Sequence, residues 1–72
     1  MVETRIIHES LPFGEDPILT VTLSLIKKGT RNEYATHIKN HCSLGLFSGR
    51  YFETYTDALL DFGVRYAREV SN

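Results

Sequence analysis

The residues best suited to chemistry lie together in the middle of the chain: His37, His41 and Cys42. On a helix, histidines four residues apart share a face and can bind one metal ion. On a strand the same two imidazoles lie ~13 Å apart, at ~3.3 Å per residue, which is too far for a single ion. Cys42 then points away from His41, so the histidine is badly placed to activate the thiol. Both kinds of site therefore depend on whether this segment is a helix or a strand.

A turn signal indicates a strand. Residues 18–28 alternate apolar and polar side chains with a period of two, which is typical of a half-buried strand. Gly29 and Thr30 follow, and a two-residue loop with glycine first is typical of a type II′ hairpin turn. The turn predicts the pairs Lys28–Arg31, Leu25–Tyr34, Leu23–Thr36 and Val21–Ile38. A hairpin of residues 18–28 and 31–42 is the result, with its aliphatic side chains on one face. In this strand Cys42 is expected to be a half-buried structural residue.

The C-terminal part predicts a helix over residues 55–70. Thr54 or Thr56 can serve as the N-cap, and Asp57 stands three residues after Thr54. A stripe at helical spacing is expected to pack on the sheet; its members are Leu59, Phe62, Tyr66 and Val70. Gly63 costs roughly 1 kcal/mol relative to alanine, and a close approach of helix to sheet would account for it. Asp57 and Asp61 are expected on an exposed face, with Asp61 four residues before Arg65.

These elements define the fold class as α+β, a small two-layer domain spanning residues 1–72. Residues 50–53 predict a further strand, and residues 2–8 are a candidate fourth strand with poor alternation. The expected sheet is therefore antiparallel and three- or four-stranded, with the helix packed on one face. The opposite face is expected to be an ordinary solvent-exposed sheet face or a polar binding surface. It would carry Thr20, Thr22, Ser24, Ala35, His37, Lys39 and His41.

Two surfaces are candidates for binding. The first is basic, because residues 18–52 hold five Lys and Arg against one Glu, although the whole chain has a net charge of −1. Its residues are Lys28, Arg31, His37, Lys39, His41 and Arg50. They would suit an acidic protein or, less well, nucleic acid, because the predicted face offers no aromatic side chains for stacking on bases. The alternative is a solvated hairpin tip without a partner.

The second surface is a ridge on the helix formed by Leu60, Val64 and Ala67, which lies away from the expected buried stripe. It would suit a homodimer or a protein partner, because a domain of this size buries only ~60% of its unfolded surface. The alternative is that the loop before the hairpin covers the ridge, through Leu11 and Phe13.

Catalysis is not expected. The serines lack the nucleophile-elbow pattern, Gly45 and Gly49 lack the spacing of a phosphate-binding loop, and 72 residues leave little room for a preorganised site. No cofactor, metal, signal pattern or membrane span is expected, and one cysteine fits a reducing, cytoplasmic location. The sequence therefore favours a small non-catalytic binding module that regulates or inhibits a larger protein. The alternatives are an accessory protein that binds RNA or DNA and a homodimeric structural module.

Overall fold

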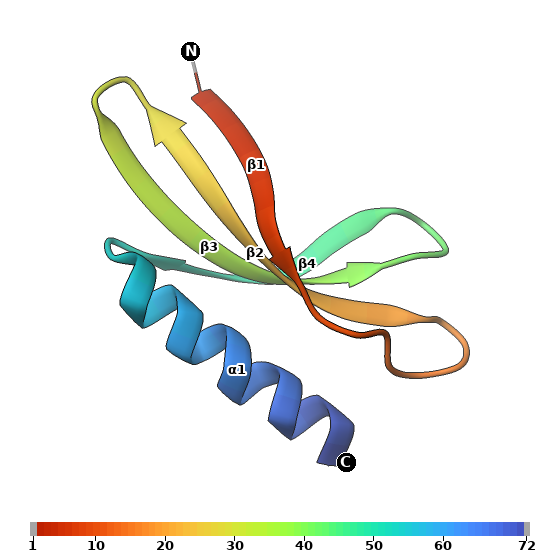
Figure 1. Ribbon diagram of the computed structural model, residues 1–72. Helices are drawn as coiled ribbons and strands as arrows, with labels where there is room; N and C mark the ends of the chain where they lie inside the picture. Colours follow the sequence, from red (N-terminus) through yellow and green to blue (C-terminus); the bar gives the residue numbers. More distant parts are fainter. Residues whose placement is uncertain (1, 72) are drawn as a thin grey trace.

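The computed structural model describes residues 2–71, which form a four-stranded antiparallel sheet with one helix against it (Figure 1). The strands follow each other along the sheet in the order β1-β2-β3-β4. Their bounds are β1 Val2–Glu9, β2 Leu19–Lys28, β3 Arg31–Asn40 and β4 Gly45–Phe52, and the helix is α1, Tyr55–Ser71. The predicted α+β class is confirmed, with residues 2–9 as the fourth strand.

The hairpin has the register that its turn predicts. Lys28 pairs with Arg31, and Gly29 adopts a positive φ of 62°. The three remaining predicted pairs, Leu25–Tyr34, Leu23–Thr36 and Val21–Ile38, are also present. Turn chemistry and hydrophobic alternation specify the same pairing, and a slip of one residue would reverse the faces of the strand.

The end of β3 differs from the prediction. Strand geometry stops at Asn40, and residues 41–44 form a turn in which the Asn40 side chain accepts a hydrogen bond from the backbone N–H of Cys42 (2.8 Å). Leu44 closes the turn by donating its N–H to the Asn40 carbonyl (2.7 Å). Cys42 is therefore exposed on a turn, and the expectation of a half-buried strand cysteine was wrong.

Both edge strands contain an irregularity. In β1, Ile7 is an extra residue between the pairs Ile6–Ser24 and His8–Leu23. In β4, which is longer than the predicted 50–53, Ser48 and Gly49 together lie opposite His37. Bulges of this kind interrupt the row of free backbone groups and make an edge a poor template for another strand.

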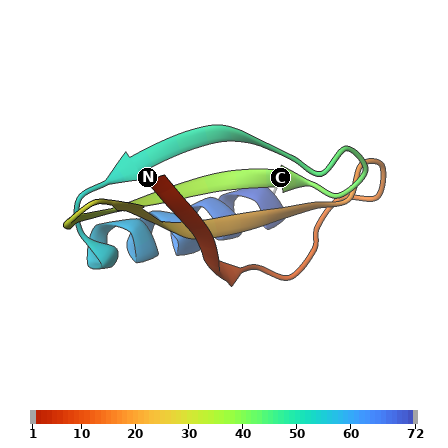
Figure 2. The ribbon, with the colours of Figure 1, turned by 90° about the horizontal axis from the view of Figure 1, so that it is seen from above.

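The sheet face opposite α1 is closed, and the expectation of a solvent-exposed face was wrong for its centre. No helix or loop covers this side in Figure 2, yet Thr22 and Ala35 are 0% exposed. Thr20 and Ser24 are buried as well. These side chains are small, and larger ones stand opposite them on the edge strands, Ile6 facing Ser24 and Tyr51 facing Ala35. The larger side chains on the edge strands shield the small side chains at the centre of this face from water.

The helix packs with a different rotation from the one predicted. Of the two candidate caps, Thr54 is the one that caps the helix, accepting a hydrogen bond from the Asp57 N–H (3.3 Å). The buried helix residues are Ala58 and Arg65, whereas Leu59 and Val70 are 41% and 50% exposed. The predicted stripe is thus correct only for its two aromatic members, Phe62 and Tyr66, which are half-buried.

Gly63 also differs from its predicted role. A Cβ built on this residue meets no atom within 4 Å, so the glycine does not mark a close approach of helix to sheet. It lies instead on the exposed side of α1.

Candidate functional site

The side of α1 that faces the sheet is polar at its centre. Arg65 is only 9% exposed, and its Nη1 lies 3.4 Å from the Thr36 hydroxyl on β3. The Thr36 hydroxyl donates to Asp61 Oδ2 at 2.6 Å, and Arg65 Nε lies 4.0 Å from the same oxygen. Asp61 is therefore part of the helix–sheet contact, and its expected place on an exposed face was wrong.

Strand β4 completes this polar network. Arg50 donates from Nη1 to Asp61 Oδ1 at 2.9 Å, and Arg65 Nη2 donates to the Ser48 carbonyl at 2.6 Å. Ser48 has a positive φ of 56° within the bulge, and this conformation directs its carbonyl to the guanidinium. Burial lowers the pKa of Arg65, and the Arg50 charge lowers it further while Asp61 opposes the shift. The guanidinium still stays charged at neutral pH, since an arginine in a protein does not lose its proton.

The opposite side of α1 is apolar and exposed. It forms an open groove of about 510 Å³, lined by Thr56, Leu59, Leu60, Gly63, Val64 and Ala67. Leu60 is 69% exposed and stands at the centre of this surface, which we call the outer helix face. A second hollow of about 380 Å³ adjoins it, where Phe52 at the end of β4 meets Leu60 and Val64. Apolar surface thus extends from the helix to the sheet edge.

The loop before the hairpin does not cover the outer helix face. Phe13 packs instead against Tyr66, with ring centroids 6.2 Å apart, and Leu11 is 73% exposed. The ridge residues Leu60, Val64 and Ala67 remain exposed and line one groove. In the layered arrangement of Figure 1, α1 is the outermost element on its side of the domain.

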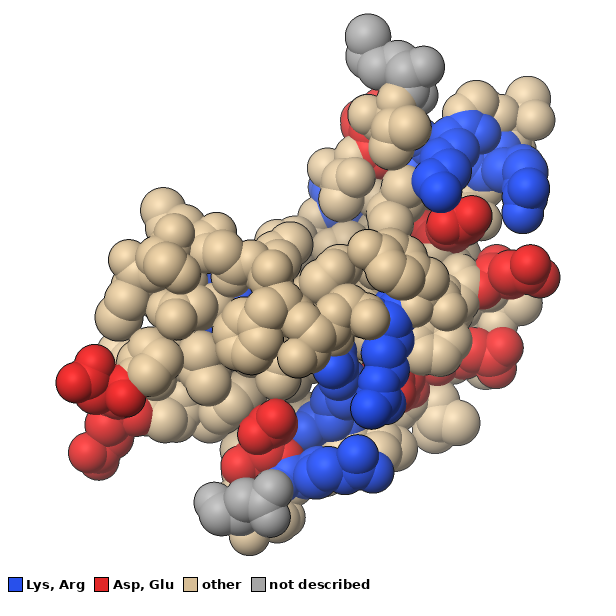
Figure 3. Space-filling view, turned by 180° about the vertical axis from the view of Figure 1, so that it is seen from behind, with Lys and Arg blue, Asp and Glu red and all other residues tan. Residues whose placement is uncertain are grey.

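The six basic-surface candidates lie in different places. Lys28 and Arg31 are at the hairpin tip, where Lys28 pairs with Glu33 at 3.2 Å. Arg50 is bound to Asp61 beside the helix, on the other side of the sheet from His37, Lys39 and His41. Figure 3 shows the Lys and Arg side chains of this face in separate groups, with acidic side chains and uncharged surface between them. The structure therefore does not bring these six residues into one patch.

His37 lies against β4 on the closed face of the sheet. Its ring meets Tyr51 edge to face, with centroids 5.9 Å apart. A Cβ at Gly49 would come within 2.7 Å of its Nε2, so only glycine fits beside the ring in this position. Its Nδ1 is buried and has no hydrogen-bond partner. Burial lowers the pKa of His37, and the positive charge of Arg65 lowers it further.

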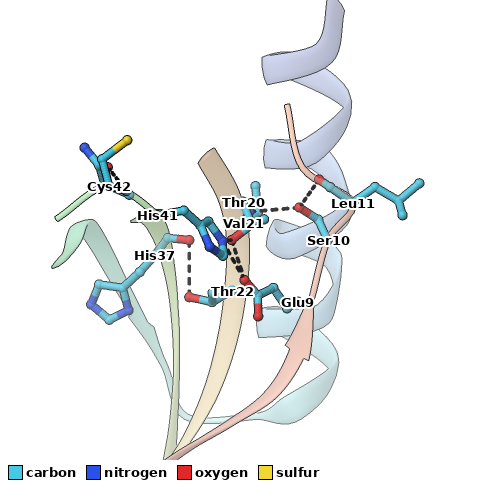
Figure 4. Close-up of polar contacts among 10 residues, drawn as sticks. Glu9, Ser10, Leu11, Thr20, Val21, Thr22, His37, His41 and Cys42 are labelled. Carbon is cyan, nitrogen blue, oxygen red and sulfur yellow. Dashed lines mark hydrogen bonds and ion pairs between the residues drawn. The ribbon is translucent and has the colours of Figure 1, made fainter. Parts of the chain in front are cut away.

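A cluster that the sequence reasoning missed joins the ends of three segments (Figure 4). The Thr20 hydroxyl donates to Glu9 Oε2 at 2.7 Å, and His41 Nε2 lies 3.1 Å from both that oxygen and the hydroxyl. The three side chains line a shallow hollow of about 490 Å³. The hydrogen bond from Thr20 is the main cause that lowers the pKa of Glu9.

The geometry of this cluster does not suit a nucleophile. A nucleophilic hydroxyl must be reachable by a substrate, but Thr20 is only 3% exposed. The cluster fastens the end of β1 to the start of β2 and to the turn after β3. The signal for it was weak, because the register of β1 on β2 could not be read from the sequence.

Within residues 2–71 no group of three or more His, Cys, Asp or Glu side chains has an arrangement that could hold a metal ion. The described part of the chain also has no helix with the length and apolar content needed to cross a bilayer. Comparison with protein-family models, with curated proteins and with solved structures found no match. The choice of a candidate site therefore depends on the geometry of the structure alone. The outer helix face is the strongest candidate for a binding site.

Proposed function

We propose that this protein is a non-catalytic binding module that acts on a larger protein by stoichiometric contact, and that the outer helix face makes the contact. One observation carries the proposal: α1 holds the charged pair Asp61 and Arg65 against the sheet and leaves a row of apolar residues exposed to solvent. Arg65 and Asp61 face the sheet, while Leu60 and Val64 face solvent. Exposed apolar surface of this kind typically marks a site of protein interaction.

The edges of the sheet and its opposite face are less suited to binding a partner than the outer helix face. Both edge strands carry bulges, which disfavour the addition of a partner strand. The centre of the opposite sheet face is closed by its own side chains. A helix that presents apolar positions at Leu60, Val64 and Ala67 matches a recurring recognition mode, in which such a helix lies in an apolar groove of the partner.

Nucleic-acid binding is less well supported. Binding to phosphates needs several positive charges along one surface, because each neutralised phosphate contributes to affinity. Here Arg50 and Arg65 are engaged with Asp61, and Lys28 with Glu33. The outer helix face is lined by uncharged residues.

The test is capture of partners from native cell extract by the tagged protein, followed by mass spectrometry and nucleic-acid detection on the same eluate. Leu60→Asp should abolish retention of a stoichiometric protein partner, because it places a carboxylate in the contact. Leu11→Asp is a matched control, since Leu11 is a leucine of similar exposure at 73% and lies in the loop before the hairpin. Equal retention by the two variants, or recovery of nucleic acid as the main species, would contradict the proposal.

A further inference from the structure

We infer that the outer helix face of the free protein binds a second copy of the chain, with the two α1 helices antiparallel. The inference rests on the proposed function for the choice of surface and adds the identity of one occupant. A larger partner would then have to displace the copy.

Two exposed residues of opposite charge border the outer helix face. Asp57 and Arg68 are exposed, and neither takes part in an ion pair among the described residues. They are eleven residues apart, which is three helical turns plus about 20°, so they lie on the same flank of the face. One charge is near each end of α1, ~16 Å apart along the axis.

The positions of Asp57 and Arg68 determine which relative orientation of the two α1 helices brings opposite charges together. Two copies can place the same helix face in mutual contact with their helices parallel or antiparallel. The antiparallel arrangement brings the same flanks together with opposite ends adjacent, so Asp57 of each copy meets Arg68 of the other. The parallel arrangement puts these flanks on opposite sides of the interface, and the charges do not meet. Charge complementarity therefore selects the antiparallel pair.

The centre of the face suits close packing. The point midway between Asp57 and Arg68 along the helix falls at residues 62–63, so Gly63 lies at the level of the two-fold axis, about 60° around the helix from Leu60. No atom lies within 4 Å of the position of its missing Cβ, and Leu60 and Val64 stand beside it. Small residues at a helix–helix contact allow axes to approach to ~8 Å. Contact between the lining residues of two copies also buries no charge, because the lining is uncharged.

The size of the core adds a reason for association. Within residues 2–71 the buried hydrophobic residues are Val21, Leu23, Ile26, Ala35, Ile38 and Ala58. Domains with so small a core commonly gain stability by burying further apolar surface against a second chain.

The first experiment measures mass by sedimentation equilibrium from micromolar to millimolar concentration, under reducing conditions because Cys42 is exposed. The wild type should approach twice the chain mass of 8.2 kDa as concentration rises. Leu60→Asp should raise the dissociation constant by on the order of a hundredfold, and Leu11→Asp should leave it unchanged. A wild type that stays monomeric at millimolar concentration, or a dimer that Leu60→Asp does not weaken, would overturn the inference.

The second experiment tests the antiparallel orientation by reversing charges. Asp57→Arg and Arg68→Asp should each raise the dissociation constant by roughly fivefold to tenfold. The double variant D57R/R68D should return it to near the wild-type value, because each copy again meets an opposite charge. Absence of this recovery would exclude the antiparallel pair. Circular dichroism of each variant confirms that the helix is intact.

The two proposals fail separately. A monomeric wild type whose capture of a larger protein depends on Leu60 would overturn the homodimer and leave the proposed function standing. A dimer that depends on Leu60, together with capture that does not, would overturn the proposed function and leave the homodimer standing.

Discussion

The two faces of α1 depart from the usual arrangement of an amphipathic helix, although Ala58 is buried and Phe62 and Tyr66 are half-buried on the inner face. The face against the sheet holds Arg65 and Asp61, and the face toward solvent holds Leu60 and Val64. A helix of a globular domain normally buries its apolar stripe and exposes its charges. In this domain hydrogen bonds and ion pairs fix the helix on the sheet, and the apolar stripe remains available for contact with another chain.

The inner network accounts for the rotation of the helix. Thr36 stands at the centre of the sheet face under α1, and a buried hydroxyl needs a hydrogen-bond partner. Asp61 and Arg65 supply one, and they also bind Arg50 and the Ser48 carbonyl on β4. Rotating α1 to bury Leu60 would leave these polar groups unpaired in the interior, which costs more than the apolar burial gains.

The largest expected effect comes from removing the inner arginine. Arg65→Ala takes away the partner of the Ser48 carbonyl and one of the charges beside Asp61, and we expect a loss of about 3–5 kcal/mol in the free energy of unfolding. The matched control is Arg68→Ala, three residues along the same helix and exposed, which should change stability by less than about 0.5 kcal/mol. Urea denaturation followed by circular dichroism measures both.

If Arg65→Ala and Arg68→Ala lowered the free energy of unfolding by similar amounts, the inner arginine would not hold the helix more strongly than the exposed one. Arg65→Met refines the test, because it keeps an apolar stem over the sheet and leaves Asp61 with Arg50 and Thr36. A smaller loss for Arg65→Met than for Arg65→Ala is expected if both packing and charge hold the helix.

The β4 bulge tests the other end of the same network. Gly49 follows Ser48, and an added Cβ would approach His37 Nε2 to 2.7 Å and Cδ2 to 3.0 Å. Gly49→Ala therefore forces the ring or the bulge to move, and we expect a loss of about 1–3 kcal/mol. Urea denaturation gives the loss, and the His37 ring resonances in an NMR spectrum should shift. Unchanged stability would show that the bulge has more freedom than the structure indicates.

Gly63→Ala on the outer face should have the opposite sign. Nothing lies within 4 Å of the new Cβ, and alanine in a helix interior is favoured over glycine by about 1 kcal/mol. The thermal midpoint of a monomeric background such as Leu60→Asp should therefore rise. In the wild-type background the same substitution should weaken self-association, because the added methyl group lies within the contact. A gain in both properties would argue against close helix packing at residue 63.

The hairpin was predictable because two independent features of the sequence agree on it. Gly29 and Thr30 set the turn, and the alternation from Leu19 to Leu25 sets the face, so only one register satisfies both. The helix ends were predictable from the Thr54 cap and the absence of proline. The ridge of Leu60, Val64 and Ala67 followed from helical spacing alone.

The rotation of the helix was not predictable in the same way. Hydrophobic periodicity assigns the buried face by residue type, and this rule fails where a buried polar network decides the packing. The members of that network come from three elements, so no local spacing connects Thr36, Ser48 and Arg65. The Glu9–Thr20–His41 cluster was missed for the same reason, since Glu9 reaches Thr20 and His41 only through the register of β1 on β2.

The smallest expected effect is on the pH dependence of stability, through His37, which lies on the other side of the sheet from Arg65. Burial lowers the pKa of His37 below its ordinary value of 6.5, and Arg65 lowers it further. As pH falls through 6.5 the unfolded chain therefore binds a proton that the folded chain does not, and the free energy of unfolding decreases. The Glu9 carboxyl, whose pKa is lowered from 4.5, adds its own loss only at more acidic pH.

His37→Gln isolates this contribution because glutamine does not titrate. Urea midpoints of the variant should fall less than those of the wild type between pH 7.5 and pH 5.5, a window about one pH unit either side of an unperturbed histidine pKa. Below pH 4.5 the two proteins should lose stability in parallel, since Glu9 is present in both. Parallel curves throughout would show that His37 takes up its proton equally well in the folded and unfolded chain, and that neither burial nor the charge of Arg65 disfavours its protonated form.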